Sequence, residues 1–194
     1  MRYLRLFIGA IALVFLAGCV SLSTVRTMHS LSSFDPLTSD IASLAFGVQA
    51  TPDLKAVPEK TKFTVTVRAA GGAPVVTKIA LVEIDPSTLA LNALPQKRGQ
   101  TIRLFGFSEE AKKQLEAQQA LWRDMKAKGT KNTSIEIGVS PYFCQVQKID
   151  QSRERFTVYI AVDGKGDLMP LIDNMSVKDL LDKSPEKTIP MCDA

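Results

Sequence analysis

The stretch Lys62–Arg68, which reads KFTVTVR, alternates apolar and polar side chains with a period of two. Successive side chains of a β-strand point to opposite faces, so this period predicts a half-buried strand. Its buried face would carry Phe63, Val65 and Val67. Further runs of strand type surround this stretch, and turn-forming residues separate several of them. These runs lie at 41–49, 78–84, 101–105, 135–139, 142–146 and 156–162.

The run 78–84 differs from the others because it is apolar on both faces except at Lys78 and Glu83. A strand that is covered on both faces shows such a continuous apolar run. The pattern therefore predicts a central strand of a sheet. Asp85 and Pro86 follow it directly and predict its end.

Residues 108–128 predict the one long helix of the chain. Ser108 is a good N-cap, and Glu109 and Glu110 interact favourably with the positive end of a helix. Gly129 fits the position just after the last turn. Apolar side chains recur at helical spacing, so one face of this helix should pack against a sheet. They include Ala111, Leu115, Trp122 and Met125.

Successive strands with tight turns, one long helix and few β-α-β units predict an α+β fold. We expect a mostly antiparallel sheet of about five to seven strands, with the helix 108–128 packed on one face. A β-sandwich with an inserted helix is the alternative. Residues 34–194 would form this fold as a single domain, which is long enough for a hydrophobic core.

The clearest functional signal lies at the N-terminus. Arg2 and Arg5 precede an apolar run of ten residues at 6–15. That length suits a signal peptide and is too short for a helix that spans a membrane, which needs about 20 residues. The run leads into Leu16-Ala17-Gly18-Cys19. At all four positions this pattern resembles the lipobox of bacterial lipoproteins.

The resemblance implies that residues 1–18 are a lipoprotein signal peptide, removed before Cys19. The Cys19 thiol would take a diacylglycerol, and its new amine a further acyl chain such as palmitate. Two or three acyl chains anchor a protein stably, at about 0.8 kcal/mol per buried CH₂. Residues 19–33, rich in Ser and Thr, would be a tether to a periplasmic domain. The alternative is an uncleaved signal anchor that extends through Leu22.

The residue after the lipobox cysteine bears on which membrane holds the protein. In enteric bacteria an aspartate at this position favours retention in the inner membrane. Val20 stands there in this chain. The resemblance therefore favours the outer membrane, with the domain in the periplasm.

Two cysteines, Cys144 and Cys192, remain after the lipobox cysteine. An even pair in an oxidising compartment predicts a disulfide, here between the strand 142–146 and the C-terminal tail. The alternative is two free thiols. A redox-active pair is not expected, because the two cysteines are far apart and the chain has no Cys-x-x-Cys motif.

The charge of the chain gives no support for a nucleic-acid partner. The chain has 24 basic and 20 acidic residues, a net charge of +4. Arg2 and Arg5 would leave with the signal peptide, so 22 basic and 20 acidic residues remain, a net charge of +2. Nucleic-acid binding proteins carry a clustered basic surface that this balance does not predict.

Most catalytic and metal-binding chemistry lacks its residues here. The one histidine, His29, lies in the expected tether, which argues against a zinc site and a Ser-His-Asp site in the domain. No Gly-x-Ser-x-Gly elbow, Walker loop or dinucleotide fingerprint is present. We therefore expect no catalytic, metal or cofactor site. Carboxylates are the remaining option, through Glu83 with Asp85 at a strand end or through Glu136.

Three groups of residues are candidates for binding. Lys97, Arg98 and Arg103, with the basic surface of the helix, would suit anionic lipid or polysaccharide, or would only keep the surface soluble. Trp122 occupies a core-like position and is interpreted as packing. Tyr142 and Phe143 are better candidates for an exposed aromatic contact.

The expected domain resembles the uncharacterised envelope lipoproteins that are common in Gram-negative bacteria. The resemblance and the missing catalytic groups together predict a non-enzymatic binding or assembly component of the envelope, with an envelope protein as its partner. A hydrolase or transferase that acts on cell-wall material through carboxylates is one alternative. A pilotin-like accessory of a secretion or pilus system is another.

Overall fold

The computed structural model of the chain describes residues 34–68, 73–127, 134–184 and 186–193. The expected signal peptide, the acylation site Cys19 and the tether with His29 lie outside the described residues. The same holds for Lys128 and Gly129, which the sequence places at the end of the long helix.

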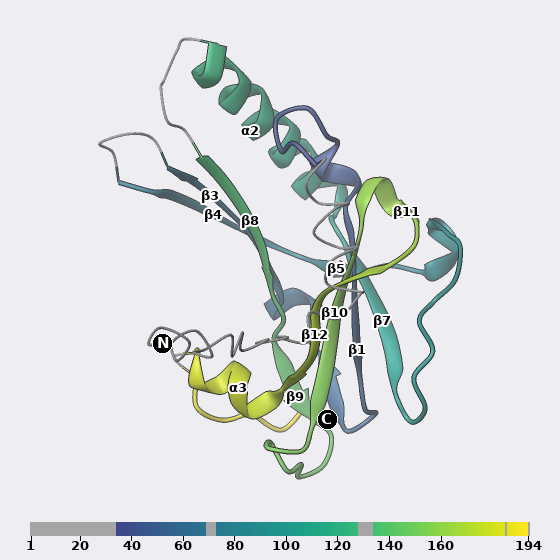
Figure 1. The fold of residues 1–194 in the computed structure, drawn as a ribbon. Coiled ribbons are helices and arrows are strands. Elements are labelled where there is room, and N and C mark those ends of the chain that lie inside the picture. The colour runs from purple at the N-terminus through teal and green to yellow at the C-terminus, as the bar shows by residue number, and fades with distance from the viewer. Residues whose placement is uncertain (1–33, 69–72, 128–133, 185, 194) are drawn as a thin grey trace, which may run out of the picture.

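The described chain is rich in strands (Figure 1). Its helices are α2 (Glu109–Ala127) and the short α3 (Val177–Asp182). Four 3-10 turns accompany them, η1 (Ile41–Ser43), η2 (Pro58–Lys60), η3 (Pro86–Thr88) and η4 (Val162–Gly164). The strands are β1 (Ala45–Ala50), β2 (Leu54–Ala56), β3 (Lys62–Arg68), β4 (Val75–Ala80), β5 (Val82–Glu83), β6 (Ala90–Leu91), β7 (Thr101–Gly106), β8 (Ser134–Ser140), β9 (Phe143–Gln145), β10 (Arg155–Ala161), β11 (Lys165–Gly166) and β12 (Met169–Ser176).

These strands form four sheets in the described part of the chain. The largest has the order β12-β10-β1-β7-β5, and the second has the order β4-β3-β8. Both are antiparallel. The pair β2-β9 is antiparallel, and the pair β6-β11 is parallel. The predicted α+β class with mostly antiparallel strands is confirmed, and α2 covers Glu109–Ala127 of the helix predicted at 108–128. The expectation of one sheet is wrong, because the strands divide into sheets of five, three, two and two.

The run 78–84 is where the prediction of a central strand fails. The chain changes sheets there: β4 is an edge of the three-stranded sheet and β5 is an edge of the five-stranded sheet. Leu81, between them, is fully buried, and its N–H donates to the carbonyl of Thr61 at 3.2 Å. The apolar residues on both faces therefore reflect a crossing between two sheets. Within the flanking strands Ile79 of β4 is buried, whereas Val82 of β5 keeps 37% exposure.

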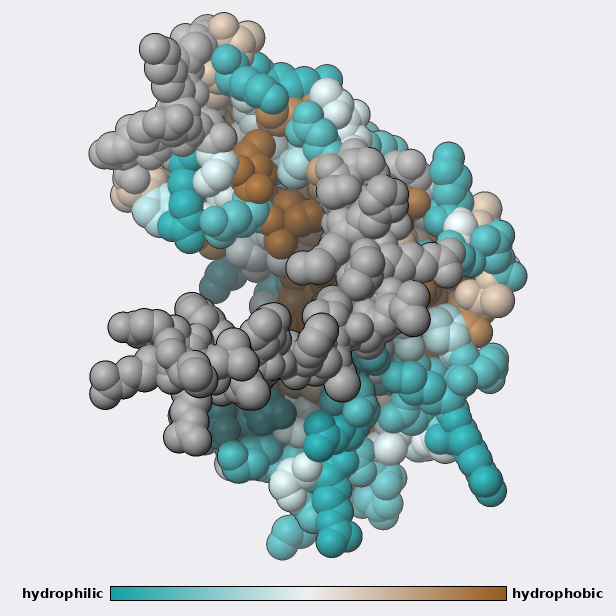
Figure 2. Space-filling model, viewed as in Figure 1, coloured by the Kyte–Doolittle hydropathy of each residue, from teal (hydrophilic) through white to brown (hydrophobic). Residues whose placement is uncertain are grey.

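The main core lies between the two larger sheets and α2. The predicted buried face of β3, with Phe63, Val65 and Val67, is confirmed. The Phe63 ring lies 5.6 Å from that of Phe46 and 5.1 Å from that of Phe107, between centroids. Three side chains of α2 join this core, namely Ala111, Leu115 and Trp122. Figure 2 shows apolar residues gathered beside α2, while hydrophilic residues cover the lower end of this face.

A smaller core covers the opposite face of the five-stranded sheet. Its apolar residues come from the sheet, from Leu168 and from the segment 84–100, which lies over it. A buried polar group holds this segment in place: the Tyr159 hydroxyl donates to Gln49 Oε1 at 2.7 Å, and Gln49 Nε2 donates to the carbonyl of Pro95 at 3.2 Å. Gln49 is only 1% exposed, so its amide depends on these partners.

We expect Tyr159→Phe to lower the free energy of unfolding by about 1–2 kcal/mol, because it leaves the buried Gln49 carbonyl without a donor. Denaturant unfolding of the purified protein measures this difference. Tyr142→Phe is the control, since Tyr142 is partly exposed and we expect a change below about 0.5 kcal/mol. Equal stability of Tyr159→Phe and the unsubstituted protein would contradict this role of the hydroxyl.

Candidate functional site

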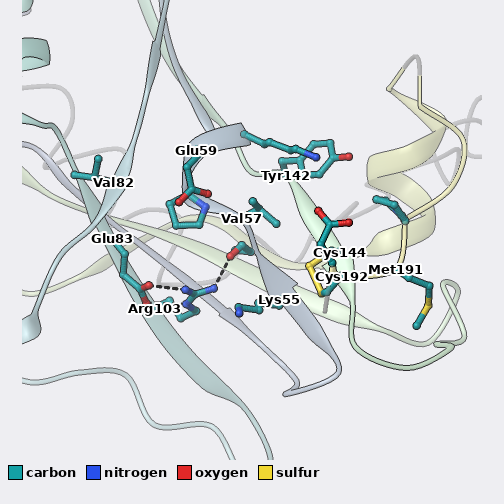
Figure 3. A pocket seen from close by; sticks show the side chains of 15 residues that line it. Lys55, Val57, Glu59, Val82, Glu83, Arg103, Tyr142, Cys144, Met191 and Cys192 are labelled. Atoms are coloured by element: carbon teal, nitrogen blue, oxygen red, sulfur yellow. Dashed lines mark hydrogen bonds and ion pairs between the residues drawn. A yellow bond between two sulfur atoms is a disulfide. The ribbon is translucent and has the colours of Figure 1, made fainter.

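A pocket of about 510 Å³ opens where the five-stranded sheet meets the pair β2-β9 and the C-terminal tail (Figure 3). We call it the disulfide pocket, because the bond between Cys144 and Cys192 lines one end of it. It is lined by Lys55, Ala56, Val57, Pro58, Glu59, Lys60, Val82, Glu83, Arg103, Tyr142, Cys144, Pro190, Met191, Cys192 and Asp193.

Arg103 of β7 forms the floor at one end of the disulfide pocket. Its Nε donates to Glu83 Oε1 at 2.7 Å, and its Nη1 donates to the carbonyl of Ala56 at 2.6 Å. One guanidinium therefore joins the edge strand β5 to β2 of the neighbouring sheet. The hydrogen bonds from Arg103 hold the pKa of Glu83 below its usual value, against a smaller opposing effect of burial.

The C-terminal tail forms the opposite end of the pocket. The disulfide joins it to β9, with the two Cα atoms 4.8 Å apart. Backbone hydrogen bonds continue this attachment, from Gln145 N–H to the Pro190 carbonyl at 2.8 Å and from Cys192 N–H to the Gln145 carbonyl at 2.9 Å. Ile189 is buried in the main core. The tail is thus a fixed wall, and Figure 3 shows Val57 between it and the Glu83–Arg103 pair.

Tyr142 and Phe143 point to different environments. Tyr142 lines the pocket, and the Lys60 ammonium lies 5.0 Å from the centre of its ring. Phe143 is buried, with its ring 4.9 Å from that of Phe156, so its prediction as an exposed contact is wrong. Neighbouring residues on an extended chain face opposite sides, which explains why only one of the two reaches the pocket.

Each of the three carboxylates that the sequence offered for catalysis has a different partner. Glu83 lines the disulfide pocket. Asp85 accepts a hydrogen bond from Ser87 N–H at 2.8 Å and caps η3. Glu136 pairs with Arg68 at 3.2 Å on an exposed face of the three-stranded sheet. Two acids that the sequence reasoning did not select, Glu59 and Asp193, share the pocket lining with Glu83.

The basic residues 97, 98 and 103 do not form one surface. Lys97 Nζ donates to Thr157 Oγ1 at 2.9 Å and lies 3.4 Å from Asp173 Oδ1, on the side of the smaller core. Arg103 is engaged by Glu83 in the disulfide pocket. The interpretation of Trp122 as a packing residue is confirmed, because its side chain is buried in the main core.

We searched the described residues for groups that could bind a metal ion and for helices that could span a membrane. Among them, no group of three or more His, Cys, Asp or Glu side chains is placed to hold a metal ion. None of the helices in the described ranges has both the length and the apolar character that crossing a membrane requires.

Most of the pocket lining could not be selected from the sequence. The cysteine pair Cys144 and Cys192 was the one sequence feature that pointed to part of this lining, because their bond brings the tail residues 190–193 beside Tyr142. Lys55, Val57 and Pro58 lie in a stretch that the sequence marks only as an extended connection. Their place in the pocket depends on the meeting of the five-stranded sheet, the pair β2-β9 and the C-terminal tail.

Comparisons of the chain with protein-family models, with curated proteins and with solved structures found no match. The fold and the site still define a class: a strand-rich α+β protein with an open, mixed polar and apolar pocket whose wall is a disulfide-bonded tail.

The Glu83–Arg103 pair should make a small, pH-dependent contribution to stability. At pH 7 we expect Glu83→Gln to lower the free energy of unfolding by about 0.5 kcal/mol, because the pair is partly exposed. The pKa of Glu83 is lowered in the folded protein, so its contribution is present above the ordinary glutamate value of about 4.3. This contribution to stability is lost as the pH falls through the lower pKa that Glu83 has in the folded protein. Unfolding curves of both proteins across this range measure the difference, and a difference that grows in acid would contradict this account.

Proposed function

We propose that this protein is a lipoprotein of the bacterial cell envelope, anchored by acyl chains on Cys19 and exposed to the periplasm, with the outer membrane favoured. In this proposal it is a non-enzymatic binding or assembly component, and the disulfide pocket is where it meets its partner. The disulfide between Cys144 and Cys192 carries the proposal. Disulfides persist in oxidising compartments, which agrees with export directed by a lipobox.

The surface of the disulfide pocket supports binding. Val82 and Met191 are among the large apolar residues that remain exposed in the described chain, at 37% and 55%, and both line this pocket. Exposed apolar side chains beside charged ones are typical of contact sites. The fixed tail gives the pocket a preformed wall, which lowers the entropy lost on binding.

The state of Glu83 favours binding over acid–base catalysis. A general acid or base works best with a pKa near the operating pH. The pKa of Glu83 is shifted in the opposite direction, because Arg103 stabilises its charged form. The same ion pair, together with the hydrogen bond from Arg103 to the Ala56 carbonyl, holds together the strands that line the pocket.

Photo-cross-linking in living cells tests this proposal. A photoreactive amino acid would replace Met191 at the pocket, and in a second strain Val76 on β4. The two sites are matched in exposure, at 55% and 49%, and Val76 does not line the disulfide pocket. We expect a discrete adduct with an envelope protein from position 191 and none from position 76. Adducts at neither position, or the same adducts at both, would contradict a partner at this pocket.

A further inference from the structure

An unpaired strand edge borders the disulfide pocket. In β5, Glu83 lies opposite Phe105 of β7, and the next residue, Ile84, donates its N–H to the carbonyl of Leu104 at 3.0 Å. Hydrogen-bonded and non-hydrogen-bonded pairs alternate along antiparallel strands. Glu83 therefore belongs to a non-hydrogen-bonded pair, and its N–H and C=O point away from β7. β5 is the last strand of its sheet in the described chain, so both groups face the open edge.

The second edge beside the pocket is already occupied. Val57 N–H donates to the carbonyl of Tyr142 at 2.8 Å, so by the same alternation Ala56 of β2 faces away from β9. Its carbonyl accepts the hydrogen bond from Arg103 Nη1. Among the described residues, no backbone group forms a hydrogen bond with the N–H or C=O of Glu83 across the β5 edge. In the described part of the chain, the β5 edge thus offers one donor and one acceptor, both from Glu83.

The side chains around this edge suit a polypeptide of low net charge. Among the described residues, three cations and three carboxylates line the pocket, so their net charge is close to zero and gives no attraction for a polyanion. The apolar part of the lining is spread from Val82 at one end to Met191 at the other, with Val57 between them in Figure 3. Apolar side chains on alternate positions of an extended chain would meet such a surface.

We propose that the disulfide pocket receives an extended segment of the partner protein. The segment pairs its backbone with the N–H and C=O of Glu83 and lays apolar side chains against Val82 and Val57. This inference rests on the proposed function and names the kind of partner surface. β5 has only two residues, which limits the pairing and protects the edge from uncontrolled sheet extension. The apolar contacts therefore supply most of the affinity.

Selection of peptides against the full mature chain, purified in detergent, tests the inference. The probe is a phage-displayed library of random peptides, and fluorescence anisotropy then measures the affinity of each selected peptide. Glu83→Pro removes the outward N–H at an edge position that tolerates proline. Glu83→Gln is the matched control, since it removes the charge and keeps the N–H. We expect about a tenfold loss of affinity for Glu83→Pro and less than about threefold for Glu83→Gln.

A second measurement needs no substitution in the protein. Each backbone nitrogen of a selected peptide is methylated in turn. The Glu83 carbonyl is the one acceptor proposed on this edge, so a peptide that adds as a strand should lose affinity when the single nitrogen that faces this carbonyl is methylated, and not when its neighbours are. Three results would overturn the inference. They are a selection that enriches no peptide, equal peptide affinity for Glu83→Pro and the unsubstituted protein, and a loss of affinity on methylation of consecutive peptide nitrogens. Specific photo-cross-links from position 191 together with such a result would leave the proposed function in place.

Discussion

Replacing Cys144 and Cys192 together by serine lowers the free energy of unfolding by about 4 kcal/mol in the chain-entropy description of a disulfide. The bond closes a loop with a sequence separation of 48 residues, and opening it gives the unfolded chain more conformations. Denaturant unfolding under oxidising conditions measures the difference. It is among the largest that we expect, because it approaches the whole stability of a small domain.

The double substitution should also release one wall of the disulfide pocket. The backbone hydrogen bonds of Gln145 to the tail remain possible, so we expect local opening of residues 190–193 before global unfolding. Hydrogen exchange of the backbone N–H at position 192 reports this opening, with the unsubstituted, reduced protein as a control that should behave in the same way. Unchanged stability and unchanged exchange would show that the bond contributes nothing to the tail.

Cys19→Ala should abolish lipid attachment altogether. The thiol of Cys19 is the proposed acylation site, and without it no thioether to diacylglycerol can form. We expect unprocessed precursor of higher mass, no incorporation of labelled palmitate, and release of the protein from the membrane fraction after cleavage at any other site. A protein with a single acyl chain binds a membrane only marginally, so partial acylation would appear as partial release of the protein from the membrane fraction.

Ser21→Ala is the matched control for this substitution. It lies two residues beyond Cys19 and leaves the four residues that resemble a lipobox unchanged. We expect normal processing and labelling of Ser21→Ala. Normal labelling of Cys19→Ala would refute the proposed anchor.

Local patterns predicted the individual elements well. The alternation in 62–68 predicted which face of β3 is buried, because burial of alternate residues needs only one covered face. Ser108 and the following acids predicted where the long helix begins; in the structure Ser108 Oγ accepts a hydrogen bond from Ala111 N–H at 3.2 Å. Both features depend on residues that are near one another in the chain.

The division into four sheets could not be predicted in this way. A run that crosses from one sheet to another, as 78–84 does around Leu81, has the same apolar composition as a central strand. The difference lies in which distant strand each half pairs with. β4 pairs with β3, and β5 pairs with β7.

The candidate site was even less accessible to sequence reasoning. Arg103 was selected as part of a basic surface, whereas it bridges Glu83 and the carbonyl of Ala56. That contact requires β2, β5 and β7 to meet, and no local pattern encodes the meeting. The cysteine pair was the exception, because two cysteines left after the lipobox have one possible partner each.

The central claim is that an acylated Cys19 anchors a disulfide-closed domain, and the intact mass of the non-reduced protein extracted from cell membranes tests it most directly. The account predicts a chain that begins at Cys19, carries a diacylglycerol with a further acyl chain, and lacks the two thiol hydrogens of Cys144 and Cys192. A chain that still begins at Met1, carries no acyl group and has both thiols free would contradict it.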